Sequence, residues 1–96
     1  MKFDIKKLLK VVKNKRLHLR VHSKDGVLFD DDVMAISSFN DEGPFDVLPE
    51  HAHFISIVLK EATIYKNETA QEHLTFGKGV LKIKDNKGDI FIGLGK

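Results

Sequence analysis

Three groups of residues in this sequence are of types that bind metal ions. His51 and His53 are two positions apart, which places both on one side of an extended segment, where they could begin a metal site. His18 and His22 are four positions apart, too far along a strand to share one ion easily. The acidic run 30–32 lacks the alternate acids, the glycine and the distal glutamate of a calcium-binding EF-hand loop. We therefore expect surface histidines and a solvated turn here, and no metal site.

No arrangement of residues typical of catalysis is visible. The chain has no Gly-rich phosphate loop and no nucleophile elbow. Ser37, Ser38 and Ser56 lie in strand-like patterns without a base placed beside them by the sequence. The absence of cysteine excludes disulfides and thiolate metal sites, and it is compatible with a reducing compartment. We therefore predict a protein that is not an enzyme and that binds no cofactor.

Charge is distributed unevenly along the 96 residues, a length that fits one domain. Residues 1–24 contain nine Lys or Arg and one acid, whereas residues 25–96 contain seven Lys and thirteen acids, so a net charge of +8 is followed by one of −6. A basic arm of this kind suits an acidic protein partner, an anionic membrane surface or nucleic acid, or it folds back on the acidic body. Nucleic acid is the weakest of these readings because the rest of the chain is net negative.

Residues 1–16 are predicted to form a basic, amphipathic helical arm. Within 4–14, four apolar residues recur with helical spacing (Ile5, Leu8, Leu9 and Val12), and four lysines surround them (Lys6, Lys7, Lys10 and Lys13). A helix of this length is marginal alone in water, so its apolar side must dock on something. The protein's own body is the first expectation, and a membrane or a neighbouring subunit is the second.

Residues 17–96 are predicted to form a small β-sandwich or barrel of about 8–10 short strands. Apolar and polar residues alternate at 17–22 and 78–84, and turn-forming residues recur every 8–12 positions. The acidic run 30–32 is expected to interrupt a strand, and 85–88 (DNKG) is expected to be a hairpin turn. The continuous apolar run 54–59 (FISIVL) predicts a central strand buried on both faces.

Residues 42–52 (EGPFDVLPEHA) carry a resemblance to a known family. Glu42, Gly43, Phe45, Pro49 and His51 keep the order and spacing of a block in the N-terminal β-sandwich domain of the epsilon subunit of F-type ATP synthases, called delta in mitochondria. Val47, Leu48 and Ala52 belong to the same block, and Gly26-Val27-Leu28-Phe29-Asp30 is similar to an earlier one. Residues 79–92 resemble the family's later strands, so the resemblance covers roughly 17–60 and 79–94.

The resemblance implies a non-catalytic central-stalk subunit that bridges the gamma subunit and the membrane c-ring, and so couples proton flow to ATP synthesis. It also implies a peripheral location on the cytoplasmic face of a bacterial inner membrane. One sandwich face would pack on gamma, and the segment 40–53, with Glu42, Gly43, Phe45, Pro49 and His51, would contact the c-ring loops or gamma. The basic helix would touch acidic gamma surface or anionic lipid.

Several features depart from the family pattern. Phe39-Asn40 stands where Pro-Gly is usual, Asp46 replaces a usual Gly, and residues 62–78 look inserted. The chain ends at Lys96, before the family's C-terminal helical hairpin, which places an inhibitory role in doubt. These departures leave open an alternative, a free-standing protein-binding module of the same fold that is no longer part of the synthase.

Overall fold

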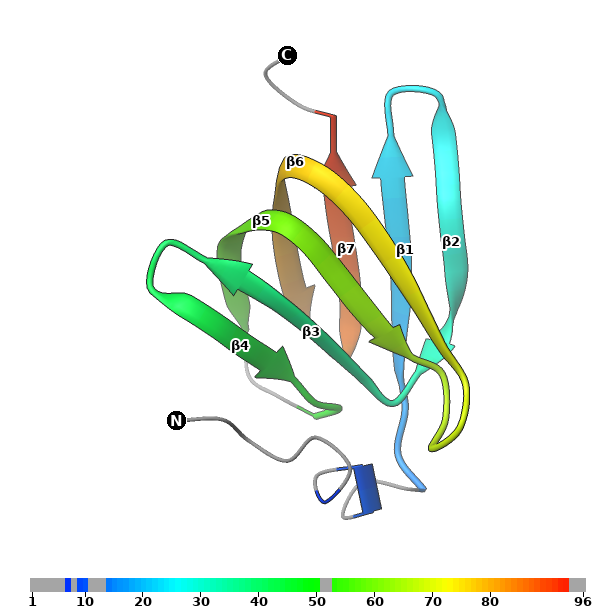
Figure 1. The fold of residues 1–96 in the computed structure, drawn as a ribbon. Helices are drawn as coiled ribbons and strands as arrows, with labels where there is room; N and C mark the ends of the chain where they lie inside the picture. The colour runs from blue at the N-terminus through cyan, green and yellow to red at the C-terminus, as the bar shows by residue number, and fades with distance from the viewer. Residues whose placement is uncertain (1–6, 8, 11–13, 51–52, 94–96) are drawn as a thin grey trace.

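The computed structural model describes residues 7, 9–10, 14–50 and 53–93. Seven strands form one mostly antiparallel sheet with the order β2-β1-β7-β6-β5-β3-β4, and only β1 and β7 run parallel (Figure 1). The strands are β1 (Leu17–Ser23), β2 (Gly26–Val33), β3 (Ala35–Asn40), β4 (Gly43–Val47), β5 (Phe54–Tyr65), β6 (Gln71–Lys84) and β7 (Lys87–Ile92).

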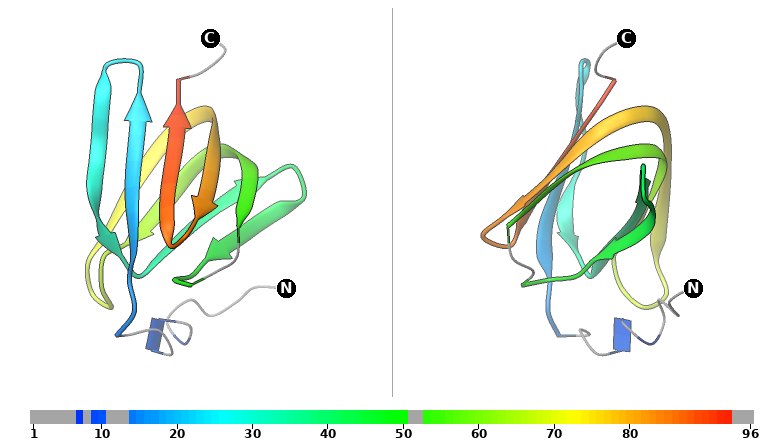
Figure 2. Two further views of the ribbon diagram at one scale, coloured as in Figure 1. Left: turned by 180° about the vertical axis from the view of Figure 1, so that it is seen from behind. Right: turned by 90° about the vertical axis from the view of Figure 1, so that its left-hand side faces the viewer.

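The single sheet becomes a sandwich because its two longest strands bend together. The pairing of β5 with β6 jumps from Leu59↔Lys78 to Glu61↔Thr75, which leaves Lys60 opposite two residues of β6. Lys60 has a positive φ of 73°, as a sharp local change of direction requires. The sheet therefore folds back on itself (Figure 2). One layer contains β2, β1, β7 and the halves of β6 and β5 before the bulge on the β7 side, and the other layer contains β3, β4 and the remaining halves of β5 and β6.

The core lies between the two layers. Every strand contributes to one buried apolar cluster, which the alternation of side chains along each strand directs inward. Its members are Leu17, Leu19, Val21, Phe29, Val33, Ile36, Val47, Val58, Ile64, Leu81, Ile83 and Ile90. The predicted sandwich is therefore correct in its layered arrangement.

The predicted number of strands was too high. The stretches 54–59 and 62–66 form one strand, β5, and 74–76 and 78–84 form one strand, β6. The bulge explains the error, because its extra residue in β6 changes which residues face the core. Before the bulge the even positions Leu74 and Phe76 face inward, and after it the odd positions Leu81 and Ile83 do. The expected interruption at 30–32 was also wrong, because β2 runs through these acids and the irregularity lies between Val21 and His22 of its partner.

The predicted hairpin turn after β6 is confirmed. Asp85 and Asn86 join the paired residues Lys84 and Lys87, with positive φ angles of 53° and 62° that are typical of a type I′ turn. The Asn86 side chain also accepts a hydrogen bond from the backbone N–H of Glu50 at 2.7 Å and donates one to the carbonyl of Arg16 at 2.7 Å. This one residue therefore ties the turn to the chain before β1 and to the segment after β4.

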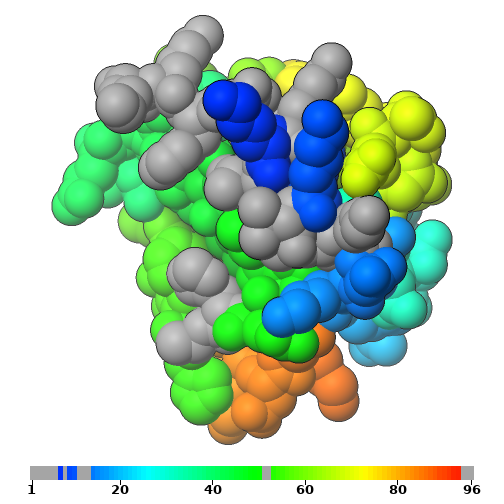
Figure 3. All heavy atoms as spheres, turned by 90° about the horizontal axis from the view of Figure 1, so that it is seen from below, coloured from blue at the N-terminus to red at the C-terminus, as the bar shows by residue number. Residues whose placement is uncertain are grey.

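The described part of the N-terminal segment lies on the body of the protein. Leu9 is 2% exposed and packs with Met34, Ala35, Leu48 and Tyr65 in a second apolar cluster. Lys7 and Lys10 are exposed, and Figure 3, which views the molecule from below, shows the described residues of the segment in dark blue on the side facing the viewer. The first expectation for docking is thus confirmed for Leu9.

The helix predicted at 4–14 stays a prediction. Lys7, Leu9 and Lys10 have helical backbone, but Lys6, Lys13 and the rest of the stretch up to Val12 lie outside the described residues. Within the described residues, no helix has the length and apolar character needed to cross a membrane.

We predict that Asn86→Ala lowers the free energy of unfolding by about 2–4 kcal/mol. Alanine loses both side-chain hydrogen bonds and also disfavours the positive φ. Asn86→Gly is the matched control, because glycine tolerates the φ angle and loses only the hydrogen bonds, so its effect is expected to be smaller. Urea denaturation of the three proteins measures the effect of the lost hydrogen bonds and the further effect of the φ angle. Equal stability of all three would contradict the assigned role of Asn86.

Candidate interaction surfaces

The β3–β4 hairpin presents the first group of predicted site residues. Asn40 pairs with Gly43, so Asp41 and Glu42 form a two-residue turn between the strands. The Asn40 side chain accepts a hydrogen bond from the Glu42 N–H at 2.8 Å and donates one to the Ser56 hydroxyl at 3.2 Å. Gly43 has a φ of 122°, a conformation that L side chains rarely adopt. Glu42 is therefore an exposed carboxylate at the tip of a hairpin whose geometry is fixed by the hydrogen bonds of Asn40.

The remaining predicted residues of this segment do not gather at the hairpin tip. Phe45 points toward the core and lies 5.7 Å from the ring of Phe54, and Pro49 is buried at the other end of β4. Five residues of strand separate Glu42 from the end of β4, a span of about 17 Å. His51 lies outside the described residues. The Asp41-Glu42 turn and Pro49 therefore lie at opposite ends of β4, so the described site residues of 40–53 do not form one compact contact point.

The second candidate surface is the outer face of the layer formed by β2, β1, β7, β6 and β5, called here the outer face. Five large apolar side chains are exposed among the described residues, and they collect here, with Leu28 at the bulge of β2. Across the strands, the pairing aligns one row of side chains on this face: Ile57, Val80, Phe91, His22 and Val27. Scattered apolar residues are normal on a surface, but a continuous row across five strands marks an interaction site.

The sequence contained a signal for this surface that was misread. The run FISIVL predicted a strand buried on both faces, yet Ile55 is 70% exposed and Ile57 is 48% exposed. Only the side with Phe54 and Val58 packs against the core. Apolar residues on both faces of a central strand indicate that both faces are covered, whereas the described residues of this chain cover only one of them.

A second row on the outer face is charged and runs parallel to the apolar one. It contains Ile55, Lys82, Asp89, Arg20 and Asp30 in successive strands. Asp89 accepts a hydrogen bond from the His22 ring at 2.8 Å, and that ring stacks on Phe91 with centroids 4.6 Å apart. The apolar row is therefore bordered by charges that are already held in position.

His18 of β1 connects this strand to β2 at the acidic side of the outer face. Its Nδ1 lies 2.8 Å from Asp32 and its Nε2 lies 2.5 Å from Asp30, while Arg20 lies 3.5 Å from Asp30. The hydrogen bonds to Asp32 and Asp30 raise the pKa of the His18 imidazole above its ordinary value. The hydrogen bond from His18 lowers the pKa of Asp30. These contacts tie edge strand β2 to β1, its neighbour in the described sheet.

The opposite outer face, on the second layer, is polar. Glu61 lies 2.7 Å from Nε2 of His73, and Nδ1 of His73 lies 3.1 Å from the hydroxyl of Thr63. A carboxylate, an imidazole and a hydroxyl in this order resemble a nucleophilic relay. Thr63 and His73 are directly paired across the β5–β6 ladder, and Glu61 lies two residues before Thr63 on β5. We interpret the three side chains as a tie between strands.

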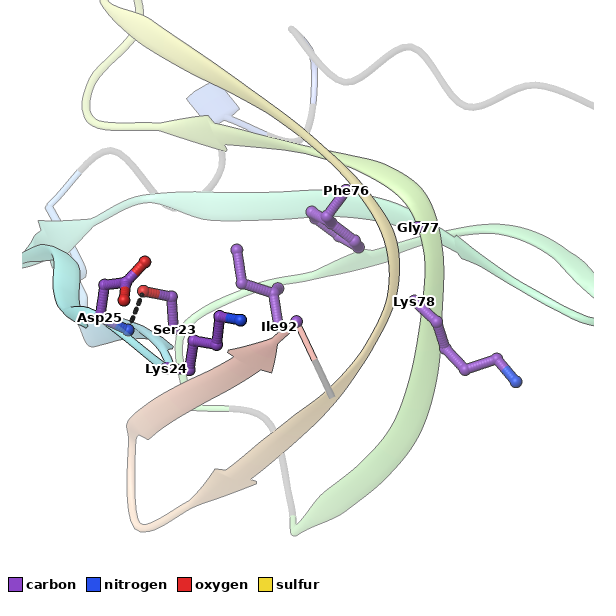
Figure 4. Close-up of a pocket in the computed structure, with 8 residues that line it drawn as sticks. Ser23, Lys24, Asp25, Phe76, Gly77, Lys78 and Ile92 are labelled. Carbon is purple, nitrogen blue, oxygen red and sulfur yellow. Dashed lines mark hydrogen bonds between the residues drawn. The ribbon is translucent and has the colours of Figure 1, made fainter. Parts of the chain in front are cut away.

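A pocket of about 490 Å³ opens at the end of the sandwich beside the bend of β6. Its apolar wall is Phe76 and Ile92, and its rim carries Ser23, Lys24 and Asp25. Figure 4 shows Lys78 extending away from Phe76 and Ile92, and Ser23 accepting a hydrogen bond from the Asp25 N–H. The polar groups of the rim are thus partly engaged with one another.

A profile of the β-sandwich domain of the ATP synthase delta/epsilon chain matches residues 16–92. The chain belongs to this family. ATP synthase epsilon chains from Campylobacter concisus and Sulfurovum sp. are 35% and 31% identical to it over 74 and 72 residues. These alignments cover 75% and 74% of this chain, but 57% and 56% of the relatives, so the chain spans a little over half the length of the epsilon chains it matches.

Solved structures show the same fold. A chain of the Euglena gracilis mitochondrial ATP synthase assembly of OSCP, F1 and c-ring superimposes with a TM-score of 0.74 at 18% identity, over 80% of this chain and 50% of that one. A chain of the Tetrahymena thermophila mitochondrial ATP synthase central stalk and c-ring gives a TM-score of 0.69 at 10% identity, over 83% and 65% of the two chains. The profile match and the epsilon-chain alignments confirm the family resemblance stated from the sequence, and these structures share its fold.

We predict that His18→Gln destabilises this epsilon-family domain at mildly acidic pH and less so at alkaline pH. A histidine with a raised folded pKa stabilises fully below the unfolded pKa of about 6.5, and this contribution is lost as the pH rises through the folded pKa. Urea denaturation of both proteins from pH 5.5 to pH 9 measures the difference. A difference that does not shrink with pH would show that ring packing, and not the charge, matters at this position.

Proposed function

We propose that this domain is a non-catalytic subunit of the rotor of an F-type ATP synthase, where it bridges the gamma subunit and the c-ring and keeps proton flow coupled to ATP synthesis. Membership of the epsilon family supports this proposal most directly. The fold shared with chains of two mitochondrial synthase assemblies is consistent with it. In this role the domain would lie peripherally at the cytoplasmic face of a bacterial inner membrane.

The outer face is the surface that we assign to gamma. It carries the apolar row through Ile57, Phe91 and Val27, whereas the opposite face is polar and partly covered by the segment around Leu9. Burial of exposed apolar surface is the main favourable term in protein association. A stable contact with a large subunit therefore favours this side of the sandwich.

The tip of the β3–β4 hairpin is the part that we assign to the c-ring. Glu42 is exposed there, on a two-residue turn held by Asn40, so its position is set by the sheet and not by a long loop. Phe45 and Pro49 support the strand that carries the tip, and Gly43 allows its turn. For His51, which the resemblance places in the same contact region, the proposal rests on the resemblance alone.

The basic arm provides a further contact in this proposal. Lys7 and Lys10 are exposed while Leu9 anchors the segment to the body, so the charged side of the arm is free to meet acidic gamma surface or anionic lipid head groups. Lys6 and Lys13 belong to the same predicted group of four lysines.

We predict that Ile57→Lys weakens binding to purified gamma by roughly tenfold or more, because it places a charge within the apolar row, at its β5 end. Thr75→Lys adds the same charge to the exposed opposite face and is the matched control, with no loss of binding expected. Co-purification and calorimetric titration measure both. Wild-type protein that does not bind gamma at all would exclude the rotor assignment and favour the free-standing module.

We predict that Glu42→Lys lowers ATP-driven proton pumping in membrane vesicles while gamma binding is unchanged. The substitution reverses the charge at the hairpin tip and leaves the outer face intact. Glu68→Lys, in the exposed turn between β5 and β6, is the control for a general effect of charge. Pumping that stays at the wild-type level with Glu42→Lys would remove the hairpin tip from the proposed c-ring contact.

A further inference from the structure

The outer face carries opposite charges on its two sides. Lys82 and Lys84 project from β6, and Asp30 and Asp32 project from edge strand β2. The pairing across β7 and β1 puts Lys82 in the same row as Asp30, and Lys84 in the same row as Asp32. Each of these rows therefore begins with a lysine and ends with an aspartate.

The strands between these two sides continue the pattern. In the row of Lys82 and Asp30, β7 carries Asp89 and β1 carries Arg20, so the signs alternate from β6 to β2 as plus, minus, plus, minus. When the same row is read from β2 to β6 instead, the charge at each position has the opposite sign. A row with that property is complementary to its own copy when the copy is turned around.

We propose that, when no other partner covers it, the outer face pairs with the same face of a second copy of this chain. The two sheets would stack face to face about a two-fold axis that lies between them, parallel to the strands and midway between β7 and β1. Such an axis brings each position on β6 against the matching position on β2 of the second copy, and each position on β7 against one on β1.

Three contacts between the charged rows in this arrangement join opposite signs: Lys82 faces Asp30 of the second copy, Lys84 faces Asp32, and Asp89 faces Arg20. The fourth, Lys87 of β7 against His18, joins two basic groups, and the aspartates that bond to the His18 ring offset it.

The same axis buries the apolar row from β6 to β2, while Ile57 on β5 lies beyond the overlap. Val80 faces Val27 of the second copy, and Phe91 faces the His22 ring. Complementary charges fix the register of such a contact, and the apolar row supplies most of its free energy.

The size of the face predicts a weak dimer. The axis overlaps four strands, β6, β7, β1 and β2, and four strands spaced about 4.8 Å apart with three rows of side chains give roughly 400 Å² for each copy. A total of about 800 Å² is the size of a weak, transient interface, so association is expected only toward millimolar concentration. Gamma and a second copy would compete for the outer face, but the dimer inference concerns the chain alone and does not depend on the rotor proposal.

The experiment is sedimentation velocity of the full chain from about 10 µM to about 1 mM, the range in which an interface of this size is expected to associate. The wild-type chain is expected to pass from monomer to dimer. Lys82→Glu with Lys84→Glu should stay monomeric, because both glutamates would face aspartates. Lys7→Glu with Lys60→Glu makes the same change in net charge away from the outer face and should dimerise like the wild-type chain.

A second variant tests the assigned orientation. Asp30→Lys with Asp32→Lys should also be monomeric alone, and mixing it with the double-glutamate variant should restore a dimer, because each Glu then faces a Lys and each remaining Lys faces an Asp. Circular dichroism checks that it folds without the His18 pairs; if it does not fold, the wild-type and double-glutamate chains decide the question. A wild-type chain that is monomeric at about 1 mM, or a double-glutamate variant that dimerises like the wild-type chain, would overturn the proposal.

Discussion

The bend shared by β5 and β6 is the constraint on which the rest of this structure depends. A flat seven-stranded sheet of this composition would expose apolar side chains on both faces, because no second layer would cover either face. The bulge at Lys60 turns the far half of the β5–β6 ribbon over the near half, so one face of the sheet covers itself. The same extra residue shifts the parity of β6, and so both Phe76 and Leu81 point inward on either side of the bend.

Folding one sheet into two layers leaves two outer faces with different properties. On the second layer, hydroxyl, imidazole and carboxylate groups bond to one another across the strands, and Leu9 packs over the lower end of it. On the first layer, an apolar row crosses five strands without a cover from the described part of the chain. Side chains on this layer are nevertheless ordered, because His22 and His18 are fixed by stacking and by carboxylates.

The sequence predicted well those features that depend on local chemistry. The Asp85-Asn86 turn, the alternating strand that precedes it and the family block around Phe45 all follow from residue types at short spacing. Features that depend on pairing were missed. Nothing local shows that 54–59 and 62–66 continue as one bent strand, and the exposure of Ile55 depends on which side of β5 the second layer folds over. Pro49 was predicted among the partner-contact residues, but packing buries it.

The two candidate surfaces lie on different parts of this small domain, as the two proposed contacts require. The outer face belongs to the strands from β2 to β5, whereas the β3–β4 hairpin lies at the far edge of the sheet, in the other layer. A partner that covers the apolar row therefore leaves Glu42 accessible. Both surfaces are carried by one continuous hydrogen-bonded sheet, so a displacement of one is passed to the other through backbone pairing and not through a flexible link. A rigid connection of this kind is what a subunit needs if it is to transmit torque between two partners.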